Sequence, residues 1–159
     1  MASKTLITPE QYLAMHFERE PEYVRGELVE RSLPTKPHSR VQHRLSLLLD
    51  RIGDCYPELR VKLADDLYRV PDFAVYPSEP EGEPTSVPAF IAIEIKSPDD
   101  RRPAVERKLD EYAAWGVAHI WFIDPEDKKL FVFDHGLKET ASLNLPQFNL
   151  IIQPADLFD

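Results

Sequence analysis

The sequence contains few of the features that mark several large classes of protein. Its single cysteine, Cys55, leaves no intramolecular disulfide, so nothing indicates a disulfide-stapled secreted domain. The longest apolar run, residues 89–93, is far shorter than the about 20 residues that span a bilayer. The first ten residues also lack the apolar stretch that characterises a signal peptide. These shortages predict a cytoplasmic protein that does not enter a membrane.

Positive charge is also scarce. The chain has 19 Lys+Arg against 28 Asp+Glu, which gives a formal net charge of −9. Proteins that bind nucleic acid through bulk charge are basic, so a nucleic-acid activity here would need a local basic surface or bound metal cations. Six arginines are candidates for such a surface: Arg40, Arg44, Arg51, Arg101, Arg102 and Arg107.

Glycine is rare, whereas proline is frequent. The 5 glycines and 15 prolines lie mostly between periodic segments, where proline marks the edges of loops. The densest proline segment, residues 77–88, is interpreted as an exposed loop inside the domain. At 159 residues with 43% hydrophobic residues, the chain can bury a substantial core. We therefore predict a single domain over residues 1–159.

Hydrophobic periodicity predicts both helices and strands. Helices are expected at residues 9–18, 39–52 and 103–115, and a hairpin with its turn at Arg25-Gly26 is expected within residues 22–33. Strands are expected at residues 60–63, 67–70, 72–76, 89–96, 119–123 and 129–133, with a further short pair near the C-terminus. This order predicts an α/β class fold (α+β), in which helices flank a mixed sheet.

The strand at residues 89–96 carries the clearest pattern. Ile91, Ile93 and Ile95 point to one face of the strand, because side chains alternate along it. Glu94 and Lys96 point to the other face, one pleat apart. Charge appears only at the C-terminal end of the strand, as is typical of a buried strand that delivers side chains into a cleft.

Two carboxylates at the ends of neighbouring strands predict a hydrolytic metal site. Asp72 follows Pro71, and 21 residues separate it from Glu94. Their oxygens, and the backbone carbonyl of Ile95, are ligands that Mg²⁺ (or Mn²⁺) prefers. Such an ion would acidify a bound water and neutralise charge on a phosphate, while Lys96 would orient or deprotonate the attacking water.

This spacing resembles that of the PD-(D/E)XK nuclease superfamily, and the longer sequence resembles its Uma-two-type branch of restriction endonucleases. The segments that carry the resemblance are Tyr23-Val24-Arg25-Gly26-Glu27-Leu28-Val29-Glu30, His38, Val70-Pro71-Asp72, Ile93-Glu94-Ile95-Lys96-Ser97-Pro98, Lys108-Leu109-Asp110-Glu111-Tyr112, Gly116-Val117 and Trp121-Phe122-Ile123-Asp124-Pro125. The resemblance implies a restriction-endonuclease-like fold with a metal-dependent phosphodiesterase site at Asp72, Glu94 and Lys96. It also implies that Glu27 supplies a further acidic group.

The resemblance leaves two lysines as candidates. Many members of this branch lack a lysine at the position of Lys96, and Lys108 on the following helix then matches a substitute. This chain has both lysines, so the choice stays open. We favour Lys96, because its strand fixes it one pleat from Glu94, whereas Lys108 must reach in from a helix.

The sequence therefore predicts a metal-dependent endonuclease that hydrolyses DNA phosphodiester bonds. A homodimer would suit symmetric cutting of a duplex. One alternative is a nuclease-like fold without catalysis that binds DNA or protein; another is a carboxylate-pair hydrolase acting on a different substrate. The histidines lack the spacing of zinc ligands, and His38 is expected in a capping or surface role.

Overall fold

A mixed sheet of six strands forms the centre of the molecule in the computed structural model, which describes residues 5–159. The strand order is β10-β9-β8-β7-β6-β3, and only the β7–β8 pair among these six strands is parallel. Their bounds are β3 (Asp54–Pro57), β6 (Phe73–Tyr76), β7 (Ile91–Ile95), β8 (His119–Asp124), β9 (Lys129–Phe133) and β10 (Leu137–Thr140). The first four residues of the segment inspected for a signal peptide lie outside the described part of the chain.

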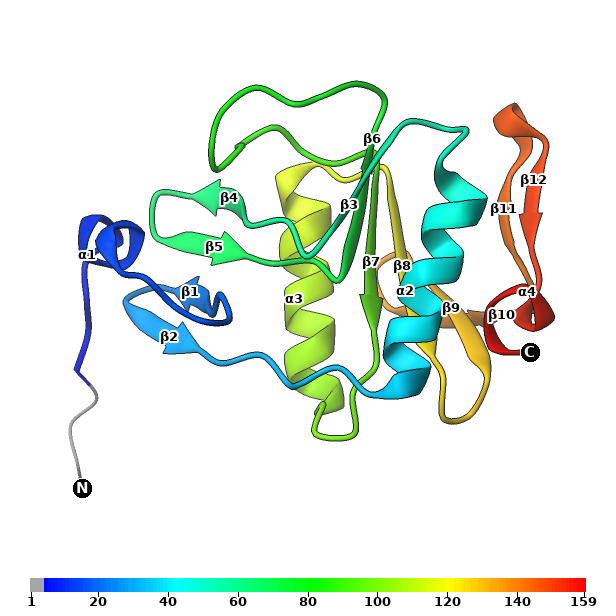
Figure 1. Ribbon diagram of the computed structural model, residues 1–159, viewed down its shortest axis with the longest axis horizontal. Helices are drawn as coiled ribbons and strands as arrows, with labels where there is room; N and C mark the ends of the chain where they lie inside the picture. Colours follow the sequence, from blue (N-terminus) through cyan, green and yellow to red (C-terminus); the bar gives the residue numbers. More distant parts are fainter. Residues whose placement is uncertain (1–4) are drawn as a thin grey trace.

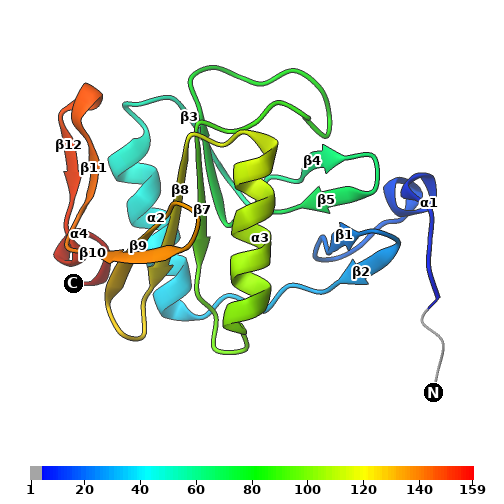
Figure 2. The same ribbon diagram turned by 180° about the vertical axis from the view of Figure 1, so that it is seen from behind.

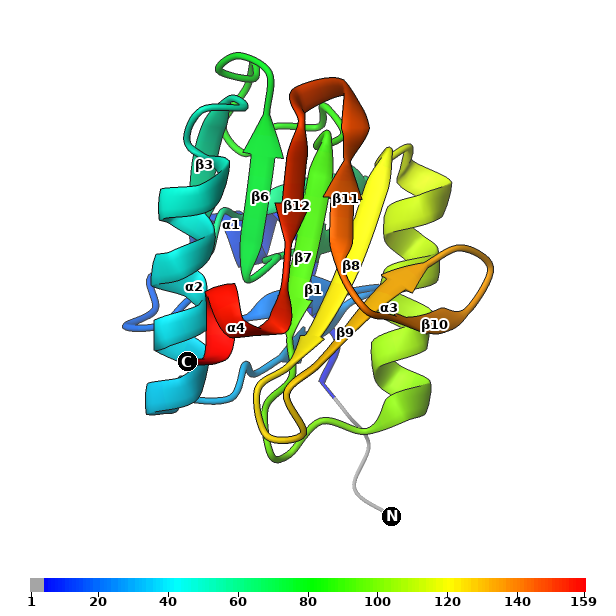
Figure 3. The same cartoon turned by 90° about the vertical axis from the view of Figure 1, so that its right-hand side faces the viewer.

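Two long helices cover opposite faces of this sheet (Figures 1 and 3). Helix α2 (Lys36–Leu49) begins after Thr35, whose side chain accepts a hydrogen bond from the backbone N–H of His38. Helix α3 (Arg102–Trp115) connects β7 to β8 and ends at Gly116, whose φ of 117° suits a residue without Cβ. The mixed sheet with helices on both faces confirms the predicted fold class.

The alternation predicted for β7 is also confirmed. Ile91, Ile93 and Ile95 lie in one apolar cluster with Leu45 and Leu49 of α2. The side chains between them face the other way: Ala92 packs in a second cluster, which includes Leu109 and Tyr112 of α3. Glu94 therefore points toward α3.

A second, smaller sheet stands beside α3, at the end of the molecule farthest from the C-terminal hairpin (Figure 2). Its four antiparallel strands have the order β2-β1-β5-β4. Their bounds are β1 (Glu22–Val24), β2 (Glu27–Val29), β4 (Val61–Ala64) and β5 (Leu67–Arg69). A three-tyrosine cluster of Tyr12, Tyr23 and Tyr68 holds helix α1 (Pro9–Ala14) against this sheet.

The C-terminal segment packs on the α2 side of the central sheet (Figure 3). It contains β11 (Leu143–Leu145), a 3₁₀ turn (Pro146–Phe148), β12 (Leu150–Ile152) and α4 (Pro154–Phe158). Arg44 of α2 and Arg51, two residues after the end of α2, donate hydrogen bonds to backbone carbonyls of this segment. These two arginines therefore help to hold the C-terminal segment against α2.

The element boundaries differ from the predicted ones in a few places. Helix α1 starts after Thr8 as predicted but stops at Ala14, and α2 runs about three residues earlier than expected because Thr35 caps it. The hairpin at Arg25-Gly26 is confirmed. Strand β3 was not predicted. Within residues 5–159, no helix has the length and apolar character needed to cross a bilayer.

Candidate active site

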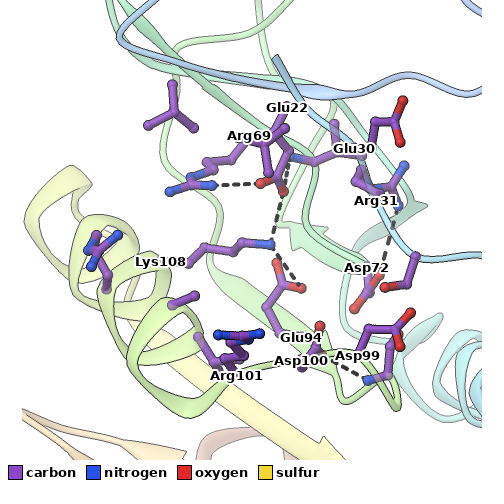
Figure 4. Close-up of a pocket in the computed structure, with 18 of the residues that line it drawn as sticks. Glu22, Glu30, Arg31, Arg69, Asp72, Glu94, Asp99, Asp100, Arg101 and Lys108 are labelled. Atoms are coloured by element: carbon purple, nitrogen blue, oxygen red, sulfur yellow. Dashed lines mark hydrogen bonds and ion pairs between the residues drawn. The ribbon is translucent and has the colours of Figure 1, made fainter. Parts of the chain in front are cut away.

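A cavity of about 540 Å³ opens between the small sheet, α3 and the C-terminal end of β7 (Figure 4). Both of the predicted metal-binding carboxylates, Asp72 and Glu94, line it. Glu27 lies on its wall from the start of β2 and is half-buried. The cavity therefore brings together three of the four side chains that the sequence predicted for the site.

Asp72, immediately before β6, is held in a fixed orientation. Its Oδ2 accepts a hydrogen bond of 2.7 Å from the backbone N–H of Ile95, and its Oδ1 lies 3.3 Å from Nε2 of His38. Burial alone would raise the pKa of Asp72, but His38 and the Ile95 N–H outweigh it and hold the pKa below its usual value. Asp72 is thus an oriented, ionised carboxylate.

The pKa of Glu94 is shifted in the opposite direction. Its Oε1 accepts a hydrogen bond of 2.6 Å from the hydroxyl of Tyr112, and its Oε2 lies 3.8 Å from Nζ of Lys108. Burial raises the pKa of Glu94 well above its usual range; Lys108 opposes this effect, and the negative charge of Asp72 adds to it. Two buried carboxylates with opposite pKa shifts are a recurrent feature of catalytic sites.

Lys108 joins Glu94 to a second acidic residue that the sequence analysis missed. This residue is Glu22, whose Oε1 lies 3.1 Å from Nζ of Lys108. The other carboxylate oxygen of Glu22, Oε2, lies 2.7 Å from Nη1 of Arg69. Burial disfavours the Lys108 ammonium, but Glu94 and Glu22 outweigh that effect and raise its pKa. Lys108 is therefore a persistent cation. Lys108 and Tyr112 are four residues apart on α3, so both reach Glu94 from one helix face.

Lys96 does not join this group. Its Nζ lies 3.3 Å from Oδ2 of Asp124, and it lines a different cavity, together with Pro98 and Pro125. Strand β7 ends at Ile95, so the alternation that places Glu94 on the α3 face no longer fixes the side chain of Lys96. The carboxylate of Asp124, at the end of β8, raises the pKa of Lys96.

His38 lies against Asp72, although a surface or capping role was expected for it. It is only 3% exposed, and its Nδ1 is a buried nitrogen without a hydrogen-bond partner. His38 does not cap α2, because the cap is Thr35, which accepts a hydrogen bond from the backbone N–H of His38; the His38 ring lies against Asp72. His38 lies in the first turn of α2, and it meets Asp72 only through tertiary packing. Sequence spacing therefore could not connect the two residues.

The donor set fits Mg²⁺ better than a metal that needs many protein ligands. Within residues 5–159, no three His, Cys, Asp or Glu side chains form a cluster that could hold a metal. Asp72 and Glu94 supply two carboxylates, and the backbone of Ile95 turns its N–H toward Asp72. The carbonyl of a strand residue points to the same side as its N–H, so Ile95 can add one oxygen. Mg²⁺ is commonly bound by one or two carboxylates while it keeps several waters.

The cationic part of the cavity wall also differs from the predicted basic surface. Only Arg101 and Arg107 of the six predicted arginines line the cavity, and Arg102 pairs with Glu106 on the outer surface of α3. The cationic side chains that line the cavity are Arg19, Arg25, Arg31, Arg69, Arg101, Arg107 and Lys108.

Comparisons with known proteins show the family and the fold of the chain. Residues 9–158 match the model of the Uma2 family, described as "Putative restriction endonuclease". The structure is similar to the crystal structure of a "putative nuclease belonging to DUF820" from Anabaena variabilis, with a TM-score of 0.76 and 26% sequence identity. That likeness covers 96% of this chain and 97% of the other, and it confirms the predicted restriction-endonuclease-like fold. No curated protein matches the chain.

Proposed function

Because this chain belongs to the Uma2 family of restriction-endonuclease-like proteins, we propose that it is a Mg²⁺- or Mn²⁺-dependent endonuclease that hydrolyses DNA phosphodiester bonds. The observation that carries the proposal is the buried pair of Asp72 and Glu94, whose pKa values are shifted in opposite directions beside a charged Lys108. A structural scaffold has no need of two such costly carboxylates in an open cavity.

Asp72, Glu94 and the carbonyl of Ile95 would hold the metal. When bound, Mg²⁺ supplies a more acidic water and a positive charge near the phosphate. The Ile95 N–H and His38 keep Asp72 ionised and oriented, while Tyr112 fixes the carboxylate of Glu94. Preorganised groups of this kind need no rearrangement at the moment of reaction.

Lys108, rather than Lys96, is the lysine that we propose for the reaction. It approaches Glu94 from α3, whereas Lys96 is paired with Asp124 outside the cavity. Since its pKa is raised, Lys108 stays protonated and acts as a hydrogen-bond donor that orients the attacking water or stabilises the charged phosphate. Glu27, on the β2 wall, is proposed as an assisting acidic group.

Cleavage of supercoiled plasmid tests the proposal. The wild type should nick and linearise the plasmid with Mg²⁺ or Mn²⁺ and should be inactive in EDTA, and Glu94→Gln should lose this activity. Glu139→Gln, which removes an exposed carboxylate on β10, is the matched control and should cleave normally. Equal cleavage by purified Glu94→Gln would show that the nicking comes from another source.

Binding of the metal is a separate test. Isothermal titration should show Mn²⁺ binding to the wild type and its loss in Asp72→Asn. Binding of DNA without any metal-dependent cleavage would favour a nuclease-like binding module instead. Sedimentation in the presence of a duplex would show whether two copies act together on the DNA.

A further inference from the structure

A second cation enters the cavity from the side opposite Lys108. Arg31 lies in the segment between β2 and α2, and it lines the same cavity as Asp72 and Glu94. Its side chain is only 10% exposed. In Figure 4, Lys108 reaches toward Glu94 from α3, while Arg31 stands on the Asp72 side. The two carboxylates are therefore flanked by cations from two different parts of the fold.

Arg31 is held from behind by residues outside the candidate metal site. Its Nη2 donates a hydrogen bond of 2.7 Å to Oε1 of Glu58, and its Nη1 donates one of 3.5 Å to the backbone carbonyl of Glu20. Glu58 also accepts a hydrogen bond from Arg19. Long, flexible side chains lose conformational entropy when they are fixed, and this anchoring has already fixed Arg31.

Asp72 does not account for the position of Arg31. Nη2 of Arg31 lies 3.8 Å from Oδ1 of Asp72, which is too long for a hydrogen bond. Asp72 already has the Ile95 N–H and His38 as partners. A guanidinium has five N–H donors in a planar fork, so Arg31 retains donors for a ligand in the cavity.

We propose, on the basis of the proposed function, that Arg31 binds a non-bridging oxygen of the phosphodiester to be cleaved, from the wall opposite Lys108. Arginine suits this role because its planar fork matches the geometry of phosphate oxygens, and charge-assisted hydrogen bonds are roughly twice as strong as neutral ones. The phosphate is then held between Arg31 and Lys108, above the metal ligands. Glu58 is a positioning residue, since it acts through Arg31.

A purely structural role for Arg31 makes a different prediction. If Arg31 only ties its segment to Glu58, its removal should lower thermal stability and leave the dependence of DNA binding on salt unchanged. A side chain that binds a phosphate, by contrast, releases counterions from the DNA. Removing one such side chain makes the slope of log K against log salt shallower by about 0.9.

The experiment measures binding and cleavage separately for wild type, Arg31→Ala, Arg31→Lys and Lys138→Ala. Lys138 is the matched control, because it is an exposed cation on β10 that pairs with Asp134 outside the cavity. Fluorescence anisotropy with a labelled DNA duplex in EDTA, at salt concentrations between about 50 and 200 mM, gives the salt slope. Plasmid cleavage in Mg²⁺ gives kcat and KM.

Arg31→Ala should make the slope shallower by about 0.9. It should lower kcat by roughly 10²–10³-fold, the usual effect of losing one donor to a charged transition state. Arg31→Lys should restore the slope but only part of the rate, since a single ammonium lacks the fork. Lys138→Ala should match the wild type in both measurements.

The outcomes separate this inference from the proposed function. A wild-type slope and a wild-type rate in Arg31→Ala would overturn the assignment of Arg31, even if its melting temperature fell. Binding with the expected slopes but no cleavage by any variant would overturn the endonuclease proposal and keep the phosphate contact. A wild type that neither binds nor cleaves DNA would overturn both.

Discussion

On the α2 face of the central sheet, β7 buries Ile91, Ile93 and Ile95 in an apolar cluster, whereas on its α3 face the same strand buries Glu94 beside Tyr112 and Lys108. Burial of an aliphatic side chain stabilises the fold, but burial of a carboxylate destabilises it unless partners compensate. The two faces of one strand therefore serve different ends. The α2 face stabilises the sheet, and the α3 face holds the carboxylate that we propose as a metal ligand.

The largest effect is expected at the ion pairs behind the α3 face. Arg69→Met removes one of the two cationic partners of buried Glu22, leaving Lys108, and also removes the hydrogen bond from Arg69 Nε to Glu111. Breaking one side of a buried pair costs about 3–5 kcal/mol of unfolding free energy. Urea denaturation measures this loss. The double variant Arg69→Met with Glu22→Gln should recover part of the stability, and no recovery would show that weaker packing, not charge, is the cause.

The next effect concerns the two lysines. Lys108→Gln should lower the cleavage rate roughly 10²–10³-fold, because it removes a fixed cation from the site. Lys96→Gln should cleave at a rate near that of the wild type, since Lys96 is paired with Asp124 outside the cavity. Plasmid cleavage at saturating Mg²⁺ compares them. The reverse pattern would support the prediction made from the sequence.

A smaller loss of stability is expected from a change on the α2 face. Ile93→Val removes one methylene from the apolar cluster, where Ile93 is fully buried. Such a change costs about 0.5–1.5 kcal/mol. Thermal unfolding should show a lower midpoint with unchanged cleavage and metal binding. A loss of activity equal to that of a site variant would show that the two faces are coupled.

The smallest effect should be a gain in thermal stability, on replacing Glu94 by glutamine. The folded-state pKa of Glu94 is raised above that of the unfolded chain, so the stability linked to its proton is full in acid and is lost as the pH rises. At neutral pH, Glu94→Gln avoids this penalty and keeps an acceptor for Tyr112. Its melting midpoint in EDTA should exceed that of the wild type by roughly 1–3 °C, since 1 kcal/mol corresponds to about 2–4 °C. The difference should vanish near pH 4, and a midpoint equal to the wild type at both pH values would contradict the electrostatic interpretation of Glu94.

The sequence predicted the parts of the site that depend on local periodicity. The alternation in β7 identified the buried face and the direction of Glu94, and the spacing from Asp72 placed both carboxylates in one cavity. The hairpin turn and the end of α3 at Gly116 were also predicted, because such signals act over a few positions. Helix α2 was predicted from its apolar spacing, but its cap at Thr35 was missed.

The sequence did not predict the contacts that depend on tertiary packing. Period two could not place Lys96, since the strand ends one residue before it. The local pattern marks Glu22 only as the start of a hairpin, and packing of the small sheet against α3 is what brings it to Lys108 and Arg69. Strand β3 was missed because Asp54 to Pro57 lacks alternation; its place at the edge of the sheet is what tolerates a proline.

The small sheet forms one wall of the cavity, and it has a smaller buried core than the central sheet that carries the other wall. Its buried core is a cluster of three tyrosines, whereas β7 is paired on both sides and covered on both faces. Regions with few buried contacts open locally at lower free energy than a central strand. We therefore expect amide hydrogens of β1 and β2 to exchange with solvent much faster than those of β7. The proposed metal ligands thus belong to the wall that we expect to exchange slowly, while Arg31 follows β2 of the other wall, so on our proposal the cleft can widen for a duplex without disturbing the carboxylates.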